Sequence, residues 1–107
     1  IRGAARGVAA LAGSTTTLRD ALLDGCGTGV HAIGAGVEPV MERTRFSRSS
    51  RYGIKEDDGA SPIVVECTFD GNAVDYYDTV LTAVPAGGID ALEPGRNHGN
   101  RPSGVTP

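Results

Sequence analysis

The sequence predicts a mixed α+β domain, with helical residues first and an antiparallel sheet after them. Residues 3–12 are rich in alanine, the apolar residues from Gly29 onward recur with a period of two, and glycine-containing turns join the period-two segments. A chain of 107 residues can form one domain with its own core. We place this domain at residues 1–93 and expect the Gly- and Pro-rich residues 94–107 to form a tail.

The helical part is predicted from spacing and capping. Val8 and Leu11 recur at helical spacing within residues 3–12. Residues 17–20 have the Thr-x-x-Asp form of a capping box, and the apolar run that follows ends at Gly25. The sequence therefore predicts either one kinked helix or two short helices.

The strands of the antiparallel sheet are predicted at residues 29–33, 37–46, 62–69 and 73–81. The polar segment 47–60 is expected to connect two of them. The run 62–69 is the predicted core strand, with one face made by Ile63, Val65, Cys67 and Phe69. No internal repeat is visible.

Composition limits the classes of partner. The formal net charge of −3 argues against nucleic acid and membrane surfaces, because both prefer a positive protein surface. Cys26 and Cys67 lack the spacing of a metal or redox motif, so we expect two buried thiols and neither metal nor cofactor. There is no apolar run long enough to span a bilayer and no secretory signal at the start, so a cytoplasmic location is expected.

The candidate site combines two arginines with a carboxylate. Arg43 and Arg45 share one face of the predicted strand 37–46. Burying two arginines is costly unless carboxylates or an anionic ligand neutralise their charges. Asp75 is the natural partner, and a carboxylate held by an arginine in a pocket can act as a general base. The alternative to an anion site is that both arginines are exposed to water. The alternative to a general base is that Asp75 forms only a structural salt bridge with an arginine. Tyr77 is placed either to donate a hydrogen bond to a substrate or to pack in the core.

Several of these segments together resemble the limonene-1,2-epoxide hydrolases and the wider SnoaL-like, ketosteroid-isomerase-like superfamily, over about residues 1–82. The segments are Val30-His31-Ala32-Ile33-Gly34, Val40-Met41-Glu42-Arg43-Thr44, the apolar strand, Asp70-Gly71 and Asp75-Tyr76-Tyr77-Asp78. The resemblance implies a cone-shaped, curved antiparallel sheet wrapped by helices, a cystatin-like α+β barrel. It also implies a deep apolar pocket and a homodimer.

The resemblance also assigns roles. It implies that Asp75 is the water-activating carboxylate and that Arg43 is the bridging, orienting arginine. We expect the substrate to be contacted by Arg45, Tyr77, Met41 and Val65. Arg45 stands where the family has its acid carboxylate, and a guanidinium cannot donate its proton usefully. The N-terminal helices that hold the water in that family have no counterpart here. Either a leading segment is missing before Ile1 or the water site is built otherwise.

Three functions follow as hypotheses. The first is an epoxide hydrolase that adds water to a small apolar epoxide by general acid and base catalysis. The second is a SnoaL-like cyclase or isomerase that moves a proton on a polyketide or steroid-like ligand, with Arg45 steadying an enolate oxygen. The third is a non-catalytic small-molecule binding domain that holds an anionic ligand between Arg43 and Arg45. His31 is expected to be structural, and His98 is assigned no role.

Overall fold

The computed structural model describes residues 1–11, 16–78, 89–91 and 97–101, and its strands pair only in parallel within this part of the chain. The strands are β1 (Arg6–Ala10), β2 (Thr17–Arg19), β3 (Leu22–Asp24), β4 (Thr28–Ile33), β5 (Val40–Glu42), β6 (Arg45–Ser47), β7 (Tyr52–Asp57), β8 (Ile63–Val65), β9 (Thr68–Asp70) and β10 (Val74–Asp78). A short 3-10 helix, η1 (Ile89–Ala91), follows them. The helical structure in these residues is too short to cross a membrane.

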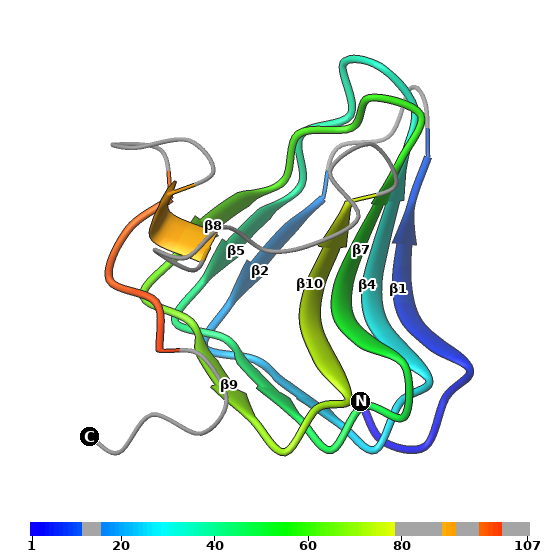
Figure 1. Cartoon of the computed structure of the whole chain (residues 1–107), viewed down its shortest axis with the longest axis vertical. Coiled ribbons are helices and arrows are strands. Elements are labelled where there is room, and N and C mark those ends of the chain that lie inside the picture. The colour runs from blue at the N-terminus through cyan, green and yellow to red at the C-terminus, as the bar shows by residue number, and fades with distance from the viewer. Residues whose placement is uncertain (12–15, 79–88, 92–96, 102–107) are drawn as a thin grey trace.

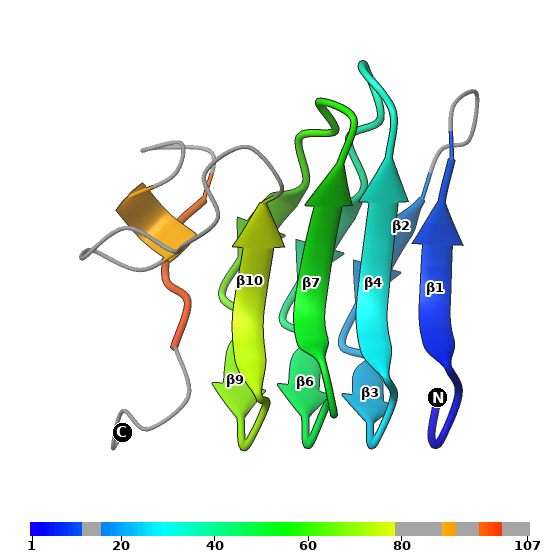
Figure 2. The same cartoon turned by 45° about the vertical axis from the view of Figure 1, so that its right-hand side comes forward.

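Each sheet takes every third strand of the chain. The sheet orders are β1-β4-β7-β10, β2-β5-β8 and β3-β6-β9. The chain therefore winds in successive three-sided coils, and each coil lies directly on the one before it (Figures 1 and 2). This architecture is a parallel β-helix, in which each coil contacts only its neighbours.

The coils share corner positions that recur every 23 residues. Between the second and third strand of each coil stand Asp20, Arg43 and Glu66, with φ of 52°, 47° and 51°. A non-glycine residue with positive φ is uncommon, so its recurrence at one corner shows that the turn itself demands this backbone conformation. The absence of an internal repeat was therefore wrongly predicted.

The core consists of side chains stacked from coil to coil. One row runs through β3, β6 and β9 and contains Leu23, Phe46 and Phe69, all buried. The rings of Phe46 and Phe69 stack with centroids 5.0 Å apart and planes 8° apart. The other main members of this core are Val30, Ile54 and Tyr76 of the four-stranded sheet and Met41 and Val64 of the second sheet.

The predicted fold class is wrong. The structure is built from parallel strands with no α-helix in its described ranges, and it is not a cone-shaped antiparallel sheet wrapped by helices. Residues 6–10 of the predicted helix 3–12 form β1, and Thr17–Asp20 forms β2 with its corner. Alanine favours a helix intrinsically, but here Ala10 of β1 and Ala32 of β4 are buried in a small cluster with Val37 and Ala60, so tertiary packing decides.

Strand boundaries also differ from the expected ones. The segment 37–46 contains two strands on different sheets, separated by the corner at Arg43, and 62–69 is divided in the same way at Glu66. The expected connection 47–60 contains β7. The strand at 29–33 is confirmed as β4, and both cysteines are confirmed as buried free thiols.

Residues 97–101, within the expected tail, lie along the edges of β8 and β9. His98 forms a parallel bridge with Val65, and Arg101 forms one with Thr68. The side-chain oxygen of Asn97 accepts a hydrogen bond from the backbone N–H of Val64 at 2.9 Å. These bonds satisfy edge groups that would otherwise be open to further strands. The remainder of the tail and residues 79–81 of the last predicted strand lie outside the described residues.

Candidate functional site

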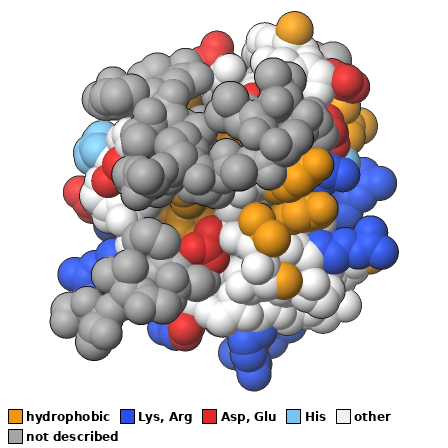
Figure 3. Space-filling view, in the orientation of Figure 1, with side chains coloured by type: hydrophobic (Ala, Val, Ile, Leu, Met, Phe, Trp, Pro, Cys, Tyr) orange, Lys and Arg blue, Asp and Glu red, His pale blue; other side chains and the backbone are white. Residues whose placement is uncertain are grey.

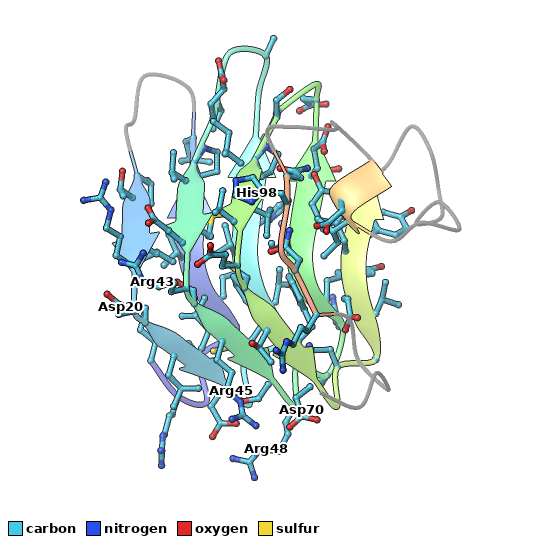
Figure 4. The ribbon with its side chains drawn as sticks, turned by 90° about the vertical axis from the view of Figure 1, so that its left-hand side faces the viewer. Asp20, Arg43, Arg45, Arg48, Asp70 and His98 are labelled. Atoms are coloured by element: carbon cyan, nitrogen blue, oxygen red, sulfur yellow. The ribbon has the colours of Figure 1, made fainter. Side chains whose placement is uncertain are left out.

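The predicted catalytic pair is divided between a corner of one coil and a strand of the four-stranded sheet. Arg43 occupies the corner between β5 and β6, where its Nε donates to Asp20 Oδ1 at 2.8 Å and its Nη1 donates to Glu42 Oε1 at 2.6 Å (Figure 4). Both contacts raise the pKa of Arg43, the hydrogen bond to Asp20 most strongly. Asp75 lies in β10 of the four-stranded sheet and accepts a hydrogen bond from Asn72 Nδ2 at 3.3 Å. The structure therefore does not bring Arg43 and Asp75 into one pocket, and the hydrolase and isomerase hypotheses stay predictions of the sequence.

The predicted substrate-contacting residues are also dispersed. Met41 is fully buried in the core, and Val65 is half-buried in β8 beside His98. Arg45 points outward from β6 and donates to Asp70 at 2.8 Å (Figure 4). Tyr77 lies in β10 and stacks on Tyr52. Arg43 and Arg45 thus each have a carboxylate partner of their own, which leaves neither guanidinium free for the anionic ligand expected between them.

Of two hollows among the described residues, the smaller one, of about 260 Å³, lies around Arg45 on the sheet β3-β6-β9. Its charges are paired. Asp24 accepts hydrogen bonds from Arg48 Nε and Ser47 Oγ, both at 2.8 Å. These bonds, that of Arg48 first, lower the pKa of Asp24 to about 2. This hollow therefore contains a structural charge network instead of groups awaiting a ligand.

The Asp24 network predicts a pH-dependent contribution to stability. Because the folded-state pKa of Asp24 lies below its ordinary value of 3.8, its stabilisation is complete above that value and is lost as the pH falls through about 2. We expect Asp24→Asn to be less stable than the wild type at pH 6, and the difference to shrink as the pH approaches 2. Urea unfolding across this range measures it.

Asp58→Asn is the matched control for that experiment. Asp58 is exposed in a turn at φ 54°, a conformation that asparagine also tolerates, so this variant should follow the wild type throughout. A stability difference for Asp24→Asn that stays constant from pH 6 to pH 2 would contradict the assignment.

The larger hollow lies on the outer face of the four-stranded sheet and has a volume of about 340 Å³. We call it the outer hollow. It is lined by Ala5, Arg6, Gly27, Thr28, His31, Arg51, Tyr52 and Lys55. The strand register places Arg6, Thr28 and Tyr52 side by side on three successive coils. The middle coil contributes small residues at these positions and the flanking coils contribute long ones, and this difference creates the hollow.

Two cations of the outer hollow have no carboxylate partner among the described residues. Arg6 and Arg51 are exposed, and neither forms an ion pair with any residue of the described ranges. In contrast, Arg43, Arg45 and Arg48 all do. In Figure 3, lysine and arginine side chains gather at the right-hand edge, on the side where Figure 1 places β1 and β4. This edge of the molecule is therefore suited to an anion.

An aromatic wall borders the outer hollow on the side of β7. Tyr52 stacks on Tyr77 with centroids 4.7 Å apart and planes 29° apart, and Lys55 Nζ lies 5.7 Å from the centroid of Tyr52. Tyr52 lines the hollow and Tyr77 does not. Tyr77 therefore holds Tyr52 in place from the far side, a positioning role in place of the substrate contact predicted for it.

His31 and Asp57 form a hydrogen-bonded pair at the upper end of the outer hollow. His31 Nε2 lies 2.5 Å from Asp57 Oδ2, and Lys55 Nζ lies 3.5 Å from the same oxygen. The hydrogen bond from His31, and then the charge of Lys55, lower the pKa of Asp57. Asp57 thus pairs with His31 and Lys55. It does not neutralise the positive charges of Arg6 and Arg51.

The residues of the outer hollow are scattered over residues 5–55 of the sequence, and no local motif marks them as a group. The signal that joins them is the repeat, since Arg6, Thr28 and Tyr52 occupy one row of successive coils, and His31 and Lys55 occupy another. Once the repeat is recognised, basic and aromatic residues at equivalent positions of adjacent coils predict one continuous surface.

Comparison with family models, with curated protein sequences and with solved structures found no match to this chain. Fold and site therefore define the class: a parallel β-helix with a cationic, aromatic-walled hollow on the outer face of its widest sheet.

Proposed function

We propose that this protein is a non-catalytic binding module for a small anionic molecule, and that the outer hollow is its binding site. The observation that carries the proposal is the pair Arg6 and Arg51, two arginines at one hollow without a carboxylate partner among the described residues. Arginine presents a fork of N–H donors that matches carboxylate and phosphate groups. An anion between or beside these side chains would supply the missing acceptors.

The surroundings favour an organic anion. Thr28, which is largely buried, and Tyr52, which carries an aromatic ring, line the same hollow as the two arginines. Binding sites for small molecules combine such an apolar surface with a few polar groups that determine orientation. A ligand with an acid group and a ring therefore fits better than an inorganic ion.

Glucuronate, a sugar ring with one carboxylate, tests this proposal, with glucose as the neutral control. We expect glucuronate to shift the backbone amide NMR signals of β1, β4 and β7, and glucose to shift none of them. Added salt should weaken binding because the arginines are exposed. The double variant Arg6→Gln/Arg51→Gln should lose at least about tenfold in affinity, since each hydrogen bond to a charged group contributes about 1.5–3 kcal/mol.

The double variant Arg43→Gln/Arg45→Gln is the matched control. It removes the same charge from two arginines that already have carboxylate partners, and it should bind glucuronate as the wild type does. Loss of binding in this control, with retention in Arg6→Gln/Arg51→Gln, would move the site to the position expected from sequence alone. Absence of any glucuronate-induced shift would refute the proposal.

A further inference from the structure

The outer hollow extends across three coils. Arg6 begins β1 and Arg51 directly precedes β7, while β4 lies between these two strands. Neighbouring strands are about 4.8 Å apart, so the backbones of Arg6 and Arg51 are separated by about 10 Å along the axis of the β-helix. The two arginines therefore line the hollow from the coils on either side of the middle one.

Little side-chain volume lies between the two arginines. Beside them the middle coil contributes Gly27 and the largely buried Thr28, and its larger side chain, His31, stands three residues further along β4. The volume of about 340 Å³ is at the small end of the roughly 300–1,000 Å³ that is usual for organic ligands. The space between the arginines is thus suited to one ring, and a lone carboxylate or phosphate would leave most of it unfilled.

The walls of the hollow add two further constraints. Tyr52 is held by its stack with Tyr77, and Lys55 Nζ lies over its ring 5.7 Å from the centroid, so the aromatic ring and the ammonium group are presented together at low conformational cost. Thr28 can donate or accept a hydrogen bond, and Lys55 can donate. A ring that carries hydroxyl groups uses both the flat surface and these polar groups.

We infer, in a step that rests on the proposed function, that the ligand is a single sugar ring with an acid group at each end. Arg6 meets one acid group and Arg51 meets the other, and the ring lies over Gly27 and Thr28 against Tyr52. Phosphate and carboxylate are equivalent for this purpose, because both accept two hydrogen bonds from a guanidinium.

Calorimetric titration with glucose 1,6-bisphosphate, glucose 1-phosphate and glucose 6-phosphate tests the inference. The bisphosphate should bind at least about tenfold more tightly than either monophosphate, because it engages both arginines. Arg6→Gln or Arg51→Gln alone should lower the affinity for the bisphosphate to that for a monophosphate. Either variant should weaken a monophosphate only about twofold, because the ligand can still turn toward the remaining arginine.

The ring is tested separately through Tyr52. Tyr52→Leu should weaken glucose 1,6-bisphosphate but leave an acyclic bisphosphate, 1,6-hexanediol bisphosphate, unchanged. Arg6 and Arg51 are exposed and have no ion-pair partner among the described residues, so their glutamine variants should keep the melting temperature of the wild type. Arg45→Gln, on another sheet, is the binding control.

Two outcomes would overturn the inference, and they differ in what they mean for the proposed function. If the bisphosphate binds no more tightly than the monophosphates, and each single variant weakens all three equally, both arginines hold one anion. The proposed function then stands and the two-ended ligand is wrong. If none of the phosphates binds and glucuronate fails as well, both the inference and the proposed function are wrong.

Discussion

Replacing Phe46 with alanine is expected to lower the free energy of unfolding by about 4 kcal/mol, within the range of about 3–5 kcal/mol for buried Phe to Ala changes. Phe46 is fully buried on β6, and its ring stacks on Phe69 of the next coil. Truncation would remove this stack and leave a cavity in the middle coil, where Leu23 lies on the other side. Because the coils form a single row of contacts, the neighbouring coils cannot collapse into the gap without bending the sheet.

Urea unfolding, followed by circular dichroism, measures this effect. Val74→Ala is the matched control, since Val74 is 38% exposed on β10 and its truncation should cost less than about 1 kcal/mol. Phe46→Leu should fall between the two because it keeps an apolar side chain but loses the aromatic stack. Equal costs for Phe46→Ala and Val74→Ala would show that the Phe46 row is not the core.

Replacing Gly29 with alanine is expected to destabilise the protein by about 3 kcal/mol, at the upper end of the usual cost of overpacking. A Cβ atom on Gly29 would lie 2.5 Å from the carbonyl oxygen of Gly53 and 2.8 Å from Cδ1 of Phe46. The first neighbour is backbone of the adjacent coil, which cannot move away without breaking the sheet. Glycine is therefore required here for close approach and not for backbone conformation.

Gly25→Ala separates these two reasons. Gly25 has φ of 65° at an exposed corner, and a Cβ there would meet nothing within 4 Å. Its replacement should cost only the strain of a left-handed alanine, about 1 kcal/mol. In thermal and urea unfolding, Gly29→Ala should be clearly less stable than Gly25→Ala. In the double variant Gly29→Ala/Phe46→Leu, the part of the Gly29→Ala destabilisation that comes from the clash with the Phe46 ring should disappear. The part that comes from the clash with the Gly53 carbonyl oxygen should remain.

The same architecture separates stability from binding. Inward positions such as Phe46 and Gly29 hold the coils together, whereas Arg6 and Arg51 face outward and have no partner in the described part of the chain. Changes in the outer hollow should therefore alter binding with little effect on unfolding. The experiments on these two sets of residues are independent for this reason.

Some elements could be predicted from local pattern. The strand at 29–33 was identified from its period-two alternation, and the buried thiols of Cys26 and Cys67 from the absence of any metal or redox spacing. Alternation does not distinguish parallel from antiparallel pairing, so the direction of the sheet was mistaken. The segment 37–46 was read as one strand because nothing in the residue type of Arg43 indicates its positive φ.

The repeat was the missed signal of greatest consequence. Leu-Leu-Asp-Gly at residues 22–25 and Thr-Phe-Asp-Gly at 68–71 stand two coils apart and share the end of a strand and its corner. The intervening coil has Arg-Phe-Ser-Arg at residues 45–48, where Arg48 adopts the positive φ that glycine adopts in the other two. Because the chain has few coils, this one departure in the middle coil is enough to conceal the 23-residue repeat in the sequence.

The sequence by itself determined that residues 29–33 form a strand, that glycine-containing turns interrupt the strands and that Cys26 and Cys67 are buried free thiols, because these follow from local residue pattern and from cysteine spacing. Only the tertiary structure decided that the strands stack in parallel, that Arg43 stands at a corner while Asp75 lies in the four-stranded sheet, and that Arg6, Arg51 and Tyr52 border one hollow. The physical reason is that coil stacking joins residues about 23 positions apart. Which positions meet depends on where the backbone turns at each corner.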